Sequence, residues 1–132
     1  MAVTTAQAQA AIEAGFNKAA ELGIPFTIAV LDGGANLVAQ VKGDGAALAS
    51  VGTSFAKAVT AVHFGQPTDA LQGAVAPGAP LFGLGSRDVA YAFVGGGVPV
   101  VNESGVIGAI GVGGGSPVDD RAVAIAALAA IG

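Results

Sequence analysis

Cysteine is absent from this sequence, and histidine occurs once, at His63. Without cysteine the protein cannot form a disulfide, a thiolate nucleophile, an iron–sulfur cluster, or a cysteine-ligated zinc or haem site. A zinc site would need further nitrogen or sulfur ligands at suitable spacing, and the sequence has none to offer beside His63. We therefore expect no metal-ion site.

Basic residues are also scarce, since five Lys or Arg stand against nine Asp or Glu and give a net charge of −4. The five cations are scattered along the chain, so no basic patch suits nucleic acid. The uncharged tail at 122–132 is shorter than the roughly 20 apolar residues of a membrane-spanning helix. Residues 1–10 lack the basic and apolar pattern of a secretory signal. These features predict a cytoplasmic protein without nucleic acid or membrane partners.

The low charge content also bears on self-association. Charged residues make up 11% of the chain, against about 25% in an average soluble domain. Soluble monomers rarely expose contiguous apolar patches beyond a few hundred Å², so part of this surface is expected to face copies of the same chain in a homo-oligomer. The alternative is that Ala and Gly raise the apolar count without making adhesive patches.

The 132 residues fit one domain, residues 1–132. Caps, glycines and runs of β-branched residues predict helices and strands in the order helix, two strands, helices, three strands, helix. The expected helices are a first one capped by Thr4 or Thr5 and ended by Gly23, then 48–64, 68–75 and 117–131. The expected strands are 26–31, 36–41, 89–94, 98–102 and 106–112. Such an order predicts an α+β fold, an antiparallel sheet of about five strands with helices packed on it.

Four stretches in sequence carry a family resemblance. They are IAVLDGGANLVA at 28–39, LASVGTSFAKAVTA at 48–61, GGGVPV at 95–100 and GAIGVGGG at 108–115. Together they resemble the GlcG/HbpS-like family, whose domain also occurs at the carboxyl end of PduO-type proteins. The resemblance implies a profilin-like sheet with helices, assembly into dimers or larger rings, and haem binding or haem degradation as in some members.

The first turn departs from the family pattern. Members often read D-A-G-G-H there, whereas residues 32–36 of this chain read Asp-Gly-Gly-Ala-Asn, so Asn36 stands where a histidine is frequent. An amide is a poorer iron ligand than an imidazole. His63 then becomes the candidate haem ligand, although its place in the last turn of a helix also suits a structural role at the unpaired carbonyls.

Lys57 is the only charged residue between Gly45 and Gln66. With neighbours at spacings of three and four it forms one polar stripe of the helix, made of Ser50, Thr53, Ser54, Lys57 and Thr60. The stripe either lines a pocket for an anion, such as a carboxylate or a haem propionate, or forms an ordinary solvated face. His63 lies roughly 120° around the helix from Lys57, so the two are not expected to hold one small ligand together.

Asp32 and the glycine runs complete the candidate residues. Asp32 precedes a Gly-Gly turn and is expected to bond its own backbone, with a role as general base as the alternative. The glycines favour close backbone packing, against a neighbouring strand or a flat ligand. The candidates of this kind are Gly95, Gly96, Gly97, Gly113 and Gly114.

Three functions remain open from the sequence. The first is a binding protein whose pocket, bounded by subunits and edged by Lys57 and Asp32 with Asn36 and Thr60, holds haem or another flat carboxylated molecule. The second is a small cofactor-independent enzyme of a catabolic pathway, in which Lys57 binds an organic acid and Asp32 moves a proton. The third is a non-catalytic oligomeric sensor or assembly module.

Overall fold

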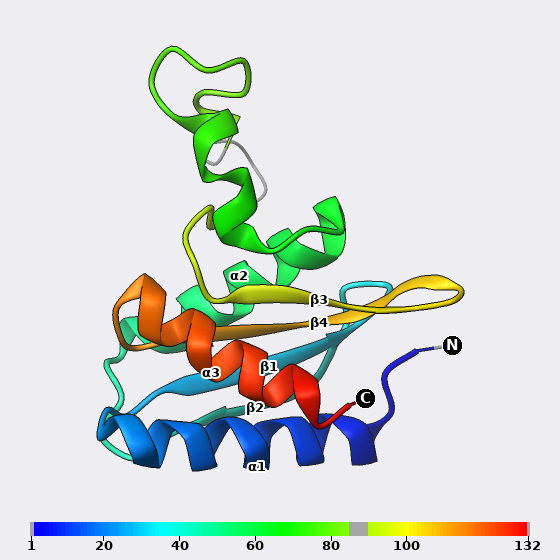
Figure 1. Cartoon of the computed structure of the whole chain (residues 1–132), viewed down its shortest axis with the longest axis vertical. Coiled ribbons are helices and arrows are strands. Elements are labelled where there is room, and N and C mark those ends of the chain that lie inside the picture. Colours follow the sequence, from blue (N-terminus) through cyan, green and yellow to red (C-terminus); the bar gives the residue numbers. More distant parts are fainter. Residues whose placement is uncertain (1, 85–89, 132) are drawn as a thin grey trace.

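The computed structural model describes residues 2–84 and 90–131, and it shows an α+β fold built on one antiparallel sheet (Figure 1). The four strands are ordered β2-β1-β4-β3, so that β1 and β4 are central. The elements in chain order are α1 Thr5–Leu22, β1 Thr27–Asp32, β2 Leu37–Lys42, α2 Ala49–Phe64, the 3-10 helix η1 Thr68–Val75, β3 Gly97–Asn102, β4 Gly105–Gly113 and α3 Pro117–Ala129. The predicted fold class is confirmed.

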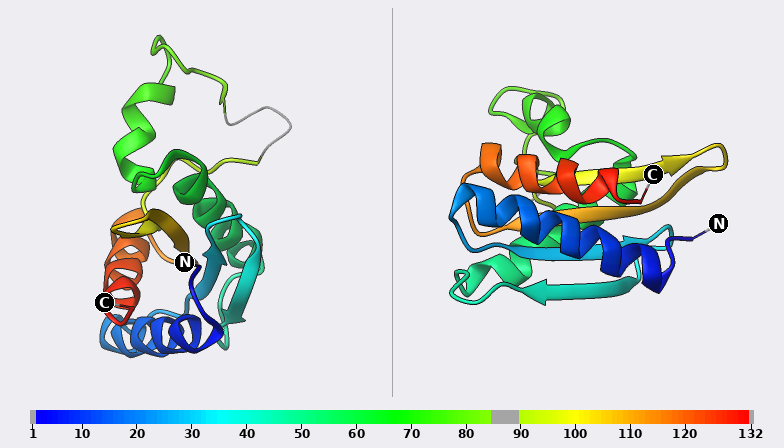
Figure 2. Two further views of the ribbon diagram at one scale, coloured as in Figure 1. Left: turned by 90° about the vertical axis from the view of Figure 1, so that its right-hand side faces the viewer. Right: turned by 60° about the horizontal axis from the view of Figure 1, so that its bottom comes forward.

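Helices cover both faces of the sheet. Helices α1 and α3 pack side by side on one face, and α2 covers the other, where it contacts β4, β1 and β3 (Figure 2). The larger apolar core lies under α1 and α3 and includes Ile28, Val30 and Ile110. The smaller core lies under α2, where Leu31 and Ala109 pack against Ala58 and Ala61 of the helix. None of the helices among the described residues combines the length and apolar character that a bilayer crossing requires.

Local chemistry sets the helix ends where the sequence predicts them. Thr4 and Gln7 form a capping box at the start of α1, and Gly23 ends that helix in the left-handed conformation with φ 70°. Gly65 ends α2 in the same way. Ser116 caps α3 by accepting a hydrogen bond from the backbone N–H of Asp119.

Helix α2 lies close against the sheet, because glycines line the strand surface beneath it. A Cβ on Gly97 would lie 2.5 Å from the carbonyl oxygen of Lys57. A Cβ on Gly111 would overlap the carbonyl oxygen of Ser54 and lie 2.6 Å from the amide nitrogen of Ala58. The helix backbone therefore rests on the strand backbone, and the positions of the α2 side chains are fixed by this contact.

A segment formed by η1 and residues 76–84 projects away from the sheet (Figures 1 and 2). Its base is held by Thr68, which accepts a hydrogen bond from the backbone N–H of Gly97, and by an exposed ion pair between Asp69 and Arg121. Its far part exposes Leu81 and Phe82, with 44% and 64% of their surfaces accessible.

The sequence prediction is wrong at one strand. Val89 lies outside the described residues, and residues 90–94 form no strand, so the described sheet has four strands instead of about five. In place of a ladder, the backbone N–H of Ala92 donates to the Thr60 hydroxyl, and the carbonyl of Val94 accepts from Thr68. Side chains thus bond two backbone groups of this segment, which a pattern of β-branched and aromatic residues cannot distinguish from a strand.

Candidate functional site

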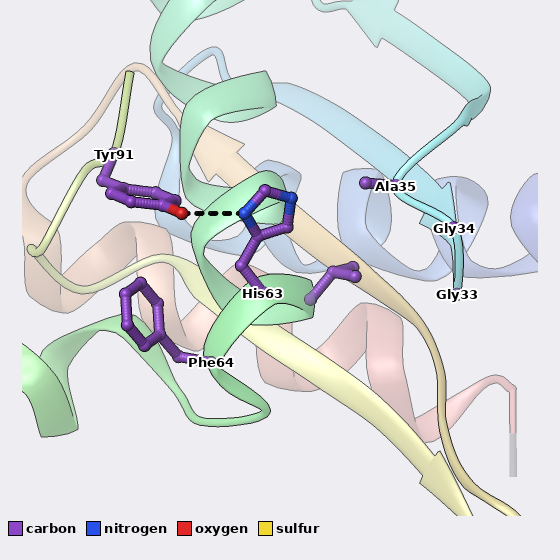
Figure 3. A pocket seen from close by; sticks show the side chains of 7 residues that line it. Gly33, Gly34, Ala35, His63, Phe64 and Tyr91 are labelled. Atoms are coloured by element: carbon purple, nitrogen blue, oxygen red, sulfur yellow. Dashed lines mark hydrogen bonds between the residues drawn. The ribbon is translucent and has the colours of Figure 1, made fainter. Parts of the chain in front are cut away.

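One hollow opens between the carboxyl end of α2 and the turn that joins β1 to β2 (Figure 3). We call it the first hollow; its volume is about 420 Å³. It is lined by Gly33, Gly34, Ala35, Val62, His63, Phe64 and Tyr91. Aromatic and glycine surfaces therefore surround the one imidazole of the chain.

His63 is held by a single hydrogen bond, between its Nδ1 and the Tyr91 hydroxyl at 2.9 Å (Figure 3). The two rings also meet edge to face with centroids 5.5 Å apart, and Phe64 packs on Tyr91 at 5.1 Å. When Nδ1 carries the proton, it donates to the tyrosine oxygen and leaves the Nε2 lone pair available. A hydrogen bond on the far nitrogen is the usual support of an imidazole that ligates a metal.

The turn beside His63 is fixed by Asp32. One carboxylate oxygen accepts hydrogen bonds from the backbone N–H groups of Gly34 and Asn36, at 3.0 and 2.9 Å, and the Asn36 amide donates to both oxygens at 3.2 Å. The backbone N–H of Asn36 is the main reason that the pKa of Asp32 lies below its usual 3.8. Asp32 thus bonds its own turn, as expected, and it positions Gly33 and Gly34 without lining the hollow itself.

A second hollow, of about 280 Å³, lies between the amino half of α2 and the start of α3. Its lining includes Lys57, which is only 4% exposed. The Lys57 Nζ donates to Asp120 Oδ2 at 2.7 Å and to the carbonyl of Val112 at 3.0 Å. Burial raises the pKa of Asp120 above its usual 3.8, and the hydrogen bond from Lys57 opposes that rise.

This ion pair corrects the expectations for Lys57. The side chain is not part of a solvated face, and it is not a free cation that awaits an anion, because a carboxylate of the same chain already neutralises it. Asp120 was missed as its partner, since from the sequence it is only an acidic residue in the first turn of a helix. The one available signal was that Lys57 is an isolated charge in an otherwise uncharged helix.

Two serines of the polar stripe join α2 to the sheet. Ser50 shares a 2.6 Å hydrogen bond with Thr27, and Ser54 accepts one from Gln40 at 2.9 Å. Thr60 donates to the carbonyl of Ala56 at 2.7 Å and is fully buried. Thr53 alone in the stripe is exposed, and it lines the second hollow together with Ser50 and Lys57.

The candidate glycines mostly face atoms of the protein. A Cβ would lie 2.7 Å from the Pro117 carbonyl at Gly95, 2.6 Å from the Val112 carbonyl at Gly96 and 2.9 Å from the Pro25 carbonyl at Gly114. At Gly113 it would overlap the Thr53 hydroxyl. These contacts agree with close backbone packing, and of the five candidate glycines only Gly114 lines either hollow.

The structure does not form one pocket edged by Lys57 and Asp32. Lys57 lines the second hollow, whereas the Asp32 turn borders the first, and the two hollows share no lining residue. The enzyme in which Lys57 holds an organic acid while Asp32 takes its proton stays a prediction, and within one chain the two residues border different hollows. Within the described residues no group of three or more His, Asp or Glu converges as a metal-ion site.

Comparisons with known proteins agree with this fold. The model of the family described as "Haem degrading protein HbpS-like" matches residues 3–129. A 15.0 kDa protein of the dhaT-dhaS intergenic region of Citrobacter freundii is 38% identical over 127 residues, which cover 96% of this chain and 89% of that protein.

Two crystal structures are also similar. Klebsiella pneumoniae ORFY is 35% identical with a TM-score of 0.95, and the match covers 98% of this chain and 90% of that one. A PduOC:heme complex is 29% identical with a TM-score of 0.94, and the match covers 98% and 95% of the two chains. The chain thus belongs to the HbpS-like family, to which its four sequence stretches pointed.

Proposed function

We propose that this protein binds haem, or another flat carboxylated molecule, in the first hollow. The observation that carries the proposal is His63, an exposed imidazole whose Nδ1 is engaged by Tyr91 at 2.9 Å and whose Nε2 has no hydrogen-bond partner among the described residues. Imidazole is a common axial ligand of haem iron. One structural relative is a PduOC:heme complex, which supports the same ligand class.

The surroundings of His63 fit a flat aromatic group. Tyr91 packs on both Phe64 and Phe93, with ring centroids 5.1 and 5.7 Å away, and these rings offer apolar faces. Gly33 and Gly34 leave only the small Ala35 side chain on the opposite wall, and Asp32 holds that turn in place. His63 would ligate the iron, and haem when bound would supply redox chemistry that no side chain of this protein provides.

Titration of the purified protein with haemin, followed by its absorbance band, tests the proposal. We expect saturable binding that weakens at least tenfold in His63→Ala, because the ligating nitrogen is lost. Tyr91→Phe keeps the ring and removes the hydroxyl, so it should weaken binding by about tenfold through the supporting hydrogen bond. Lys42→Met, outside the first hollow, is the matched control. Unchanged affinity in both His63→Ala and Tyr91→Phe would refute the assignment.

We also propose that copies of the chain associate through the projecting segment. Residues 70–84 carry no charged side chain, and Leu81 and Phe82 are exposed near the end of the segment. Two molecules of net charge −4 repel each other least where they meet through uncharged surface.

Light scattering after size-exclusion chromatography should show an oligomer for the unaltered protein. Phe82→Asp should shift it toward the monomer, because a buried unpaired carboxylate is costly. Val118→Asp, at a valine in the first turn of α3 that is 78% exposed, is the control and should leave the oligomer intact. A monomer at all concentrations would overturn this proposal. An oligomer without haemin binding would favour the assembly module.

A further inference from the structure

We propose that the second hollow is a separate binding site for a short, uncharged organic molecule with an oxygen acceptor, such as an aliphatic ketone. The hollow shares no lining residue with the first one and lies at the other end of α2. Its distinguishing feature is the buried Lys57–Asp120 pair in its lining.

The lining of this hollow contains unused hydrogen-bond donors. The Lys57 ammonium has three N–H groups, and the described structure uses two of them, for Asp120 Oδ2 and the carbonyl of Val112. The exposed Thr53 hydroxyl also has no partner among the described residues. Each Asp120 oxygen accepts one bond, Oδ1 from the backbone N–H of Gly115 at 2.8 Å and Oδ2 from Lys57. A ligand oxygen would accept a hydrogen bond from the unused N–H of Lys57 or from the Thr53 hydroxyl.

Electrostatics favour an uncharged ligand. Lys57 and Asp120 are 2.7 Å apart and cancel each other, so the lining offers no net charge to pair with an ion. A carboxylate or phosphate placed against Lys57 would also approach the buried Asp120 carboxylate and would be repelled. A neutral carbonyl oxygen accepts a hydrogen bond from the ammonium without adding a buried charge.

The volume of the hollow and its remaining wall suit a small, partly apolar ligand. The volume of about 280 Å³ corresponds to roughly nine water molecules at the density of the liquid. Apolar side chains complete the wall, and they belong to Ala47, Ala49, Ala92, Val94 and Pro117. A short aliphatic chain with one oxygen acceptor matches both parts of this lining.

Titrations of the ¹⁵N-labelled protein with 2-butanone and with butyrate, followed by NMR, test the proposal. We expect saturable shifts of the Ala92, Gly114 and Gly115 amides with 2-butanone, at a Kd in the millimolar range because so few atoms bind. Butyrate has a chain of similar length and a negative charge, and it should bind at least tenfold more weakly. Tighter binding of butyrate would overturn the choice of an uncharged ligand.

Two variants assign the shifts to this hollow without breaking the ion pair. Ala49→Leu adds side-chain volume at its wall, and Thr53→Val removes the hydroxyl at nearly constant shape; both should weaken 2-butanone binding several-fold. Gly52→Ala, on the outer side of the same helix where a Cβ meets nothing within 4 Å, is the control. Shifts that persist unchanged in Ala49→Leu and Thr53→Val would overturn the site. Haemin binding should be unaffected by either, so failure here and failure of the proposed function are distinguishable.

Discussion

Replacing Lys57 with methionine is expected to lower the free energy of unfolding by about 3–5 kcal/mol, because the buried Asp120 carboxylate loses its partner. The two side chains are 5% and 3% exposed, so water compensates only partly for the lost ammonium. Urea denaturation at neutral pH measures the change. Lys42→Met, at an exposed lysine of β2, makes the same chemical substitution and should change stability by no more than about 0.5 kcal/mol.

A double variant separates loss of the pair from loss of side-chain packing. Lys57→Met with Asp120→Asn removes both charges and keeps an oxygen that can accept from the backbone N–H of Gly115. Since no unpaired charge remains buried, this variant should recover most of the stability lost in Lys57→Met. A loss in Lys57→Met no larger than in Lys42→Met, or no recovery in the double variant, would contradict the buried ion pair.

The pH dependence of the single variant gives a further check. Burial already raises the pKa of Asp120 above its usual 3.8, and removal of Lys57 takes away the interaction that opposes this rise. The native state then binds a proton more readily than the unfolded chain above pH 3.8, so its stability falls as the pH rises through that window. The cost of Lys57→Met should therefore shrink as the pH is lowered toward 4.

The elements that the sequence predicts well are those decided by neighbours in the chain. Thr4, Gly23 and Ser116 form capping hydrogen bonds with residues a few positions away, so the local sequence is enough to predict these helix ends. The Asp32 turn is equally local, because its carboxylate bonds residues two and four positions ahead. The same local logic fails at residues 90–94, whose partners Thr60 and Thr68 lie far away in sequence.

The candidate site depends on contacts that no local pattern contains. Lys57 and Asp120 are 63 positions apart, and His63 and Tyr91 are 28 apart. The sequence identified Lys57 and His63 as unusual and predicted that they do not hold one small ligand together; in the structure they line two separate hollows. The sequence did not identify Tyr91 or Asp120, because these residues come close to α2 only in the folded protein.

The second large effect on stability is expected from a substitution at one of the glycines beneath α2. Gly111→Ala is expected to lower the free energy of unfolding by about 3 kcal/mol or more, because the new methyl group would overlap the Ser54 carbonyl and approach the Ala58 nitrogen within 2.6 Å. Both obstacles are helix backbone, so no side chain can rotate away. Gly52→Ala is the matched control, because its methyl group meets nothing within 4 Å and raises helix propensity. It should stabilise the protein by about 0.5–1 kcal/mol.

The substitutions at Gly111 and Gly52 are also expected to differ in their effect on ligand binding in the two hollows. Helix α2 carries Thr53 and Lys57 to the second hollow and His63 to the first, and its height above the sheet is set by the contact at Gly111. If Gly111→Ala folds at all, the helix must move outward, and haemin and 2-butanone should both bind more weakly. Gly52→Ala should leave both affinities unchanged. Equal stability of the two variants in urea denaturation would mean that the helix does not rest on the strand backbone as described.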